Sequence, residues 1–133
     1  MIEMSLMSPS KETDNKLRWE ADVDGVSFKL YIPKWRVPTP WPKQILVTIK
    51  DQEEPTSLRL ASSKDSDPES PISAIVRRVA EHSETARFAP LGDQEDWQIG
   101  EPYIPYKLLP SESVQTLRLD IAWDRSGGVW SEN

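Results

Sequence analysis

One segment of the chain carries tryptophan, arginine and lysine side chains on a proline-rich backbone. It reads Lys34-Trp35-Arg36-Val37-Pro38-Thr39-Pro40-Trp41-Pro42-Lys43. Tryptophan and arginine are the residue types most enriched at the energetic hot spots of protein interfaces, and a backbone stiffened by proline loses little conformational entropy on binding. The segment therefore predicts a contact surface for a protein partner, made by Lys34, Trp35, Arg36, Trp41 and Lys43.

The same residues support two other interpretations. Cations interleaved with aromatic rings also suit an anionic ligand such as single-stranded nucleic acid, with the cations on phosphates and the rings stacked on bases. Alternatively, Trp35 or Trp41 covers the core, and the cations pair with the protein's own acidic loops. Solvent exposure of the two tryptophans separates these interpretations, because exposure of both favours binding and burial of both favours a plain scaffold.

The overall charge argues against nucleic acid as the main partner. The chain has a formal net charge of −6 at pH 7, whereas proteins that bind phosphates cluster lysine and arginine. Residues 26–50 nevertheless hold five basic residues and no acidic one. We therefore expect one locally basic segment in an acidic protein, and a protein partner rather than a nucleic acid.

The sequence has no pattern typical of a catalytic or cofactor site. His82 is the only histidine, and no triad motif accompanies it. Acidic groups such as Asp93, Glu95 and Asp96 lack the spacing of a calcium loop, and neither cysteine nor a glycine-rich phosphate loop is present. The sequence predicts a non-catalytic protein without cofactor or metal; the alternative is a small enzyme with a cleft that holds two carboxyl groups of raised pKa.

A β-hairpin is predicted between Leu17 and Ile32. Asp24-Gly25 supplies the two residues with positive φ that a type I′ turn needs. If Val23 faces Val26, apolar residues lie opposite one another on a single face of the hairpin. These expected pairs are Ala21 with Phe28, Trp19 with Leu30, and Leu17 with Ile32.

Further along the chain, alternating apolar residues predict strands at 45–50, 57–61, 85–91, 97–99 and 114–123, and a short strand at 129–130 after a turn at Gly127-Gly128. Residues 33–42 and 62–70 predict loops. Ser70-Pro71 is typical of a helix start, and apolar residues then recur at i, i+3, i+4 and i+7, which predicts one short helix near 71–82. Its β-branched residues make a strand the alternative.

The tripeptide Tyr-Ile-Pro occurs at residues 31–33 and again at 103–105, an offset of 72 residues that also aligns Pro38 with Pro110 and Ile49 with Ile121. This repeat suggests an internal β duplication, although two independent strand-to-loop junctions would look the same. The expected fold is α+β, mainly antiparallel β, as a small sandwich or open barrel with that one helix.

Residues 1–16 predict a disordered leader, followed by a single domain at 17–133. The chain contains no apolar run of membrane-spanning length. We therefore expect a soluble cytoplasmic protein without membrane contact.

Overall fold

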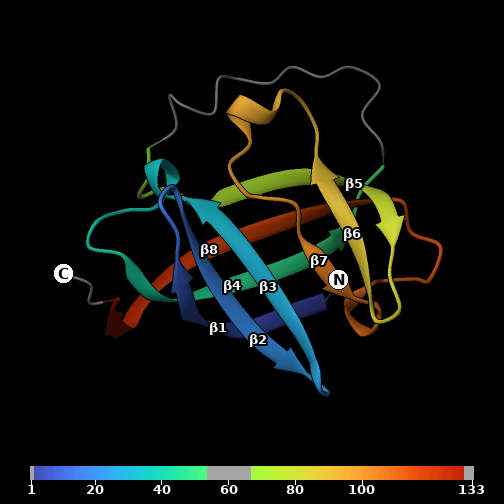
Figure 1. Ribbon diagram of the computed structural model, residues 1–133, viewed down its shortest axis with the longest axis horizontal. Helices are drawn as coiled ribbons and strands as arrows, with labels where there is room; N and C mark the ends of the chain where they lie inside the picture. Colours follow the sequence, from blue (N-terminus) through green and yellow to red (C-terminus); the bar gives the residue numbers. More distant parts are fainter. Residues whose placement is uncertain (1, 54–66, 131–133) are drawn as a thin grey trace.

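The computed structural model describes residues 2–53 and 67–130 of the chain. This part forms eight antiparallel strands that pair in the order β1-β2-β3-β7-β6-β5-β8-β4, and β4 pairs again with β1 to close a barrel (Figure 1). The expected mainly antiparallel β-structure is confirmed. The strands are β1 (Ile2–Glu12), β2 (Lys16–Val23), β3 (Val26–Pro33), β4 (Pro42–Asp51), β5 (Ile72–Glu81), β6 (Thr85–Pro90), β7 (Tyr103–Pro105) and β8 (Thr116–Val129).

The helical elements in the described residues are 3-10 turns of three residues each: η1 (Lys34–Arg36), η3 (Gln94–Asp96) and η4 (Tyr106–Leu108). Within residues 2–53 and 67–130, no helix is long and apolar enough to cross a lipid bilayer.

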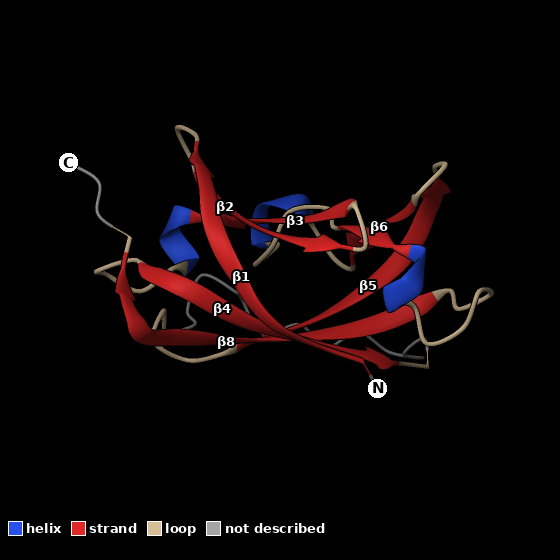
Figure 2. Cartoon of the chain, turned by 90° about the horizontal axis from the view of Figure 1, so that it is seen from below, coloured by secondary structure: helices blue, strands red, loops and turns tan. Residues whose placement is uncertain are grey.

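Side chains fill the interior of the barrel, as expected for a ring of eight strands. Alternate residues along each strand point inward, so that β4 buries Ile45, Val47 and Ile49 while the residues between them are partly exposed. Seen from below, the strands curl around this core (Figure 2). The largest fully buried apolar side chains are Trp19, Phe28 and Phe88.

The predicted hairpin is confirmed in every pair. Val23 faces Val26, and the pairing continues without a shift to Leu17 and Ile32. Asp24 and Gly25 have φ angles of 52° and 89°, as a type I′ turn requires. The local sequence was sufficient here because both the turn chemistry and the burial of one face favour the same register.

The predicted helix near 71–82 is wrong, because these residues form strand β5. Its apolar residues are divided between two faces: Ile72 and Val76 are buried in the core, whereas Val79 is 48% exposed. Ile72 and Val76 are the i, i+4 pair that suggested a helical stripe. They also lie on one face of a strand, because residues separated by an even number of positions share a face. The high β-branched content favours the strand, since such side chains lose rotamer freedom in a helix.

Residues 2–12 lie in a strand, although the sequence predicts a disordered leader at 1–16. Residues 2–12 form β1, which pairs with β4 at one end and with β2 at the other. This strand fills the gap between β4 and β2, so that its backbone groups satisfy two strand edges at once.

Other expectations have mixed outcomes. Residues 97–99 are not a strand, and β8 continues through Gly127-Gly128 to Val129 without the predicted turn. The predicted strand at 57–61 lies outside the described residues, as does most of the predicted loop at 62–70.

The two Tyr-Ile-Pro copies occupy similar places in the barrel. The first ends β3 and leads into η1, and the second forms β7 and leads into η4. After each 3-10 turn a backbone N–H bonds back to its first residue: Val37 donates to Lys34 O at 3.2 Å, and Leu109 donates to Tyr106 O at 3.1 Å. Both copies therefore mark the corner where a strand leaves the sheet.

Candidate functional site

The structure does not bring the five predicted binding residues together on one surface. Trp35 is 40% exposed and Lys43 is exposed. Arg36 is only 1% exposed, and Trp41 is half-buried. The two tryptophans therefore differ in exposure, so neither of the simple outcomes expected from the sequence occurs.

Trp41 and Lys34 belong to a packed aromatic corner. The Trp41 ring meets the edge of Trp130 at a centroid distance of 5.9 Å, and Lys34 Nζ lies 5.5 Å from the Trp41 ring centroid. Lys34 Nζ also lies 2.7 Å from Glu12 Oε2. This cation is thus already paired within the protein, which reduces its value for an anionic ligand.

Arg36 is a buried anchor. Its guanidinium donates hydrogen bonds to Gln98 Oε1 at 2.6 Å, to the backbone oxygens of Asp67, Pro68, Ser70 and Pro71 at 3.0–3.2 Å, and to Ser70 Oγ at 3.2 Å. Burial lowers the pKa of Arg36, whereas the charge of Asp67 acts to raise it. An arginine still keeps its proton in this setting, so Arg36 holds the turn at 67–71 against η1.

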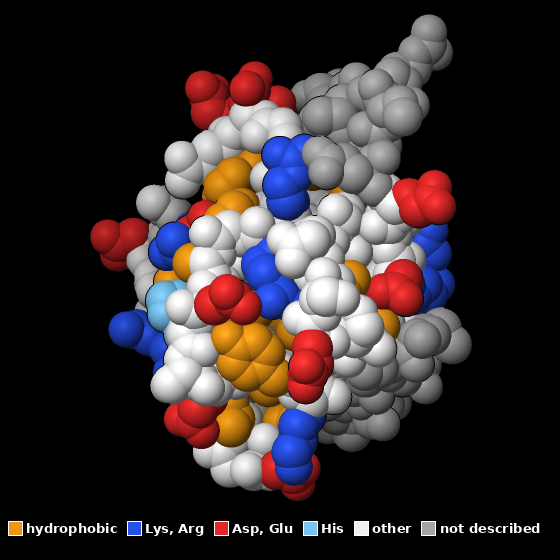
Figure 3. Space-filling view, turned by 90° about the vertical axis from the view of Figure 1, so that its right-hand side faces the viewer, with side chains coloured by type: hydrophobic (Ala, Val, Ile, Leu, Met, Phe, Trp, Pro, Cys, Tyr) orange, Lys and Arg blue, Asp and Glu red, His pale blue; other side chains and the backbone are white. Residues whose placement is uncertain are grey.

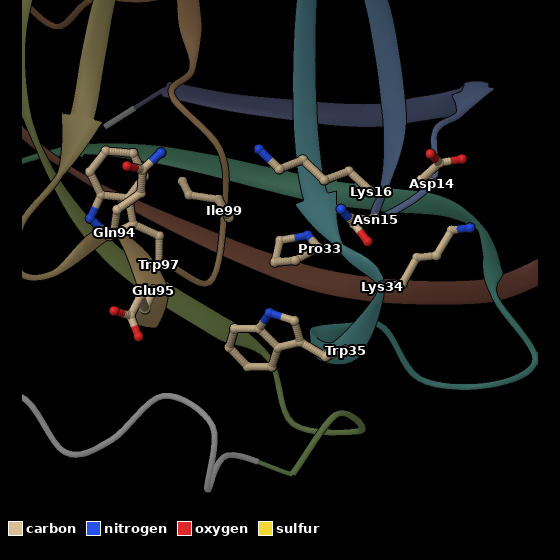
Figure 4. A pocket seen from close by; sticks show the side chains of 10 residues that line it. All are labelled: Asp14, Asn15, Lys16, Pro33, Lys34, Trp35, Gln94, Glu95, Trp97 and Ile99. Atoms are coloured by element: carbon tan, nitrogen blue, oxygen red, sulfur yellow. The ribbon is translucent and has the colours of Figure 1, made fainter.

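A groove lies beside this anchor and contains Trp35 (Figure 4). Three segments that are distant in sequence meet there: the β1–β2 turn, the end of β3 with η1, and the loop around η3. The groove has a volume of about 460 Å³ and is lined by Asp14, Asn15, Lys16, Pro33, Lys34, Trp35, Gln94, Glu95, Trp97 and Ile99.

Backbone hydrogen bonds fix the groove-lining loops. In the β1–β2 turn, the Thr13 amide donates to Lys16 O at 2.8 Å and Thr13 Oγ1 accepts from the Lys16 amide at 3.0 Å. The Lys34 amide donates to Asn15 O at 2.8 Å and thereby joins η1 to this turn. On the other side, the Trp97 amide closes η3 by donating to Gln94 O at 3.2 Å.

The apolar surface of the groove comes mainly from Trp35 and Trp97, with Pro33 and Ile99 between them (Figure 4). Trp97 is half-buried, and its indole Nε1 donates to Gly92 O at 3.2 Å. The Arg36–Gln98 hydrogen bond joins the residues that directly follow the two tryptophans in sequence. Arg36 is therefore a positioning residue that ties one wall of the groove to the other.

The polar residues of the groove are balanced in charge, since Asp14 and Glu95 offset Lys16 and Lys34. Among the interactions of the described residues, none engages the side chains of Asp14, Lys16 or Glu95. These groups can therefore bind a ligand without first breaking an internal contact.

Sequence reasoning identified Trp35 and Lys34 of the groove but missed Lys16 and Trp97. The signal for Trp97 was weak, because the sequence placed it in a predicted strand next to an acidic turn. Lys16 lay at the edge of the predicted leader, where no function was expected.

The histidine and two carboxylates outside the groove have structural partners. His82 stacks on Tyr103 with a centroid distance of 5.4 Å. In the described part of the chain, no group of three or more acidic or histidine side chains is placed to hold a metal ion. The pKa of Asp24 is lowered by its hydrogen bond and charge interaction with Lys107, and that of Asp124 by hydrogen bonds from Ser126. Such shifts are opposite to those of a carboxylate that acts as a general acid.

No protein-family model matches this chain, and no curated protein sequence matches it. The geometry of the groove is therefore what points to a function.

Proposed function

We propose that this protein is a non-catalytic, cytoplasmic interaction module that binds a segment of a partner protein in the groove between Trp35 and Trp97. The observation that carries the proposal is that two tryptophans from distant segments line one groove whose walls are joined by a partly buried hydrogen bond. Aromatic side chains held in place before binding supply contact area at a small entropic cost.

A protein segment fits the groove better than an anionic ligand does. Of the three cations expected to meet phosphates, Arg36 is buried and Lys34 is paired with Glu12. On the face shown in Figure 3, acidic and basic side chains are interspersed around hydrophobic ones, without a broad basic patch. A strong nucleic-acid binder relies on clustered positive charge.

Site-specific photocrosslinking tests this proposal. A photoreactive amino acid at position 35 should crosslink to a partner from the source cells, and mass spectrometry should map the adduct to one segment of that partner. Position 79 is the matched control, because Val79 is also exposed but lies on β5 outside the groove. The proposal fails if both positions give the same adducts, or if Trp97→Ala, in a folded variant, leaves the adduct at position 35 unchanged.

We also propose that the barrel consists of two copies of one four-stranded unit, β4-β1-β2-β3 and β8-β5-β6-β7. The ring order supports this division, because each unit has the same internal pairing. Both hairpins β1–β2 and β5–β6 also carry a register shift near the end of their first strand, between Pro9 and Lys11 and between Arg78 and Ala80. The β4–β8 pairing includes Thr48 opposite Asp120, two residues that are 72 positions apart.

An experimental structure tests the duplication. Superposition of the two units should align the two register shifts and the two 3-10 corners at the same time. If the units superpose only over single hairpins, the Tyr-Ile-Pro repeat reflects two independent corners.

A further inference from the structure

We infer that the groove recognises a proline-bearing, extended segment that carries an acidic side chain toward Lys16 and a basic side chain toward Glu95. This inference rests on the proposed function, since it assigns the chemistry of the segment that would bind between Trp35 and Trp97.

The first step concerns the ammonium group of Lys16. A Cβ atom built on Gly100 would lie 3.7 Å from Lys16 Nζ, so the lysine side chain lies directly over this glycine. Gly100 is buried and its amide donates to Tyr31 O at 2.8 Å. The ammonium thus lies close to Gly100 at the groove, and within the described residues it has no anionic partner. A carboxylate entering the groove would supply one.

The second step concerns the opposite wall. Glu95 lies on η3 beside Trp97, whereas Lys16 of β2 and Lys34 of η1 lie on the other side (Figure 4). The other acidic residue of the groove, Asp14, lies at the far end from Trp97 (Figure 4). The groove therefore has an unpaired cation on one wall and an unpaired anion on the other, and charge complementarity predicts a ligand with both signs.

The third step concerns the backbone of the ligand. Among the described residues, each strand of the barrel has a paired neighbour on both sides, so the ring offers little free edge to which a partner could add a strand. Recognition must then use side chains and the shape of the segment. A polyproline II segment suits this situation because it is extended before binding and packs its proline rings on aromatic side chains.

Two synthetic peptides test the inference. The acidic peptide is acetyl-Glu-Pro-Pro-Leu-Pro-Gln-amide, and the basic peptide is acetyl-Gln-Pro-Pro-Leu-Pro-Lys-amide. Binding to the full chain is followed by NMR through the indole N–H signals of Trp35 and Trp97, with affinities from titration. We expect both peptides to shift these two signals, and a version with glycine in place of proline to bind more weakly.

Charge reversals then separate the two ends of the groove. Lys16→Glu should weaken the acidic peptide roughly tenfold, because an attraction between partly exposed charges is replaced by a repulsion. It should change the affinity for the basic peptide by less than about twofold, since that peptide has no carboxylate to contact position 16. Glu95→Lys should give the opposite pattern. Both residues are exposed, so circular dichroism is expected to show an unchanged fold.

The outcomes distinguish this inference from the proposed function. If both peptides bind and Trp35→Ala abolishes binding, but the two charge reversals affect both peptides equally, the charge assignment is overturned and the groove remains the binding site. If neither peptide shifts the indole signals, the inferred ligand class is overturned, and photocrosslinking at position 35 decides the proposed function independently. If a thymidine oligonucleotide shifts those signals in a salt-dependent manner and the peptides do not, both are overturned.

Discussion

Replacement of Arg36 by leucine should destabilise the barrel substantially, although it removes a buried charge. Leucine is an informative choice because the corresponding position after the second Tyr-Ile-Pro is Leu108, which is also buried. The substitution therefore puts the side chain of one corner of the barrel into the other corner.

The magnitude follows from the acceptors that Arg36 leaves behind. The backbone oxygen of Asp67 also accepts from Ser70, and that of Ser70 also accepts from the Trp123 indole, so both stay satisfied. Gln98 Oε1 and the backbone oxygens of Pro68 and Pro71 lose the donor that Arg36 provides. At about 1 kcal/mol for each partly buried acceptor, the loss is about 3 kcal/mol. Removal of a buried charge and burial of the leucine side chain should raise the free energy of unfolding by about 1 kcal/mol.

We therefore expect Arg36→Leu to lower the free energy of unfolding by about 2 kcal/mol, which corresponds to a Tm decrease of roughly 8 °C for a chain of this size. Urea and thermal unfolding followed by far-UV circular dichroism measure both quantities. Arg125→Leu is the matched control, because Arg125 also bonds to a backbone oxygen, that of Pro40, but is exposed. It should cost less than about 1 kcal/mol. Equal losses for the two variants, or no loss for Arg36→Leu, would refute the reasoning from unsatisfied acceptors.

Three further predictions concern single side chains. Trp19→Phe should lower the free energy of unfolding in urea by only about 1 kcal/mol, because the buried Trp19 Nε1 has no hydrogen-bond partner among the described residues, and loss of this unsatisfied donor offsets part of the cost of the cavity; a loss above about 3 kcal/mol would contradict this. Burial raises the pKa of Asp120, but Lys50 and other neighbours outweigh this, so the pKa lies below its ordinary 3.8. The stabilisation by Asp120 should therefore be complete above that pH and lost as the pH falls below it, so the stability difference between the wild type and Asp120→Asn should shrink in acid; a difference that stays constant with pH would contradict the shift. Gly25→Ala should cost about 1 kcal/mol, because φ at Gly25 is 89° and a side chain is strained there although space is open around it; an unchanged urea midpoint would show that the turn relaxes.

The hairpin was predictable from sequence because the residues that determine its turn and its register lie close together in the chain. Asp24-Gly25 defines the turn, and only one register buries Trp19, Leu30 and their neighbours together. By contrast, the residues of β5 fit a helix and a strand almost equally well. The strand is favoured because β5 pairs with β6 and β8, and both of these strands lie later in the sequence.

The candidate site was only partly predictable for the same reason. Trp35 was identified because tryptophan beside lysine and proline is an unusual combination. The burial of Arg36 depends on backbone oxygens that lie 31 to 35 residues further along the chain. Backbone acceptors of this kind leave no side-chain pattern in a sequence that would predict them. Lys16 and Trp97 meet across the groove only because the barrel closes.

The ring closure has a consequence for engineering. Strand pairing between the two four-stranded units runs along two seams, β3 with β7 and β4 with β8. Among the described residues, β1–β4 end before residue 53 and β5–β8 begin after residue 67, so we expect fragments divided between these positions to pair with each other along both seams. Fused to two proteins of interest, such fragments would report their proximity in a living cell through refolding of the barrel, and Arg36 would hold them together by bonds that cross from one fragment to the other.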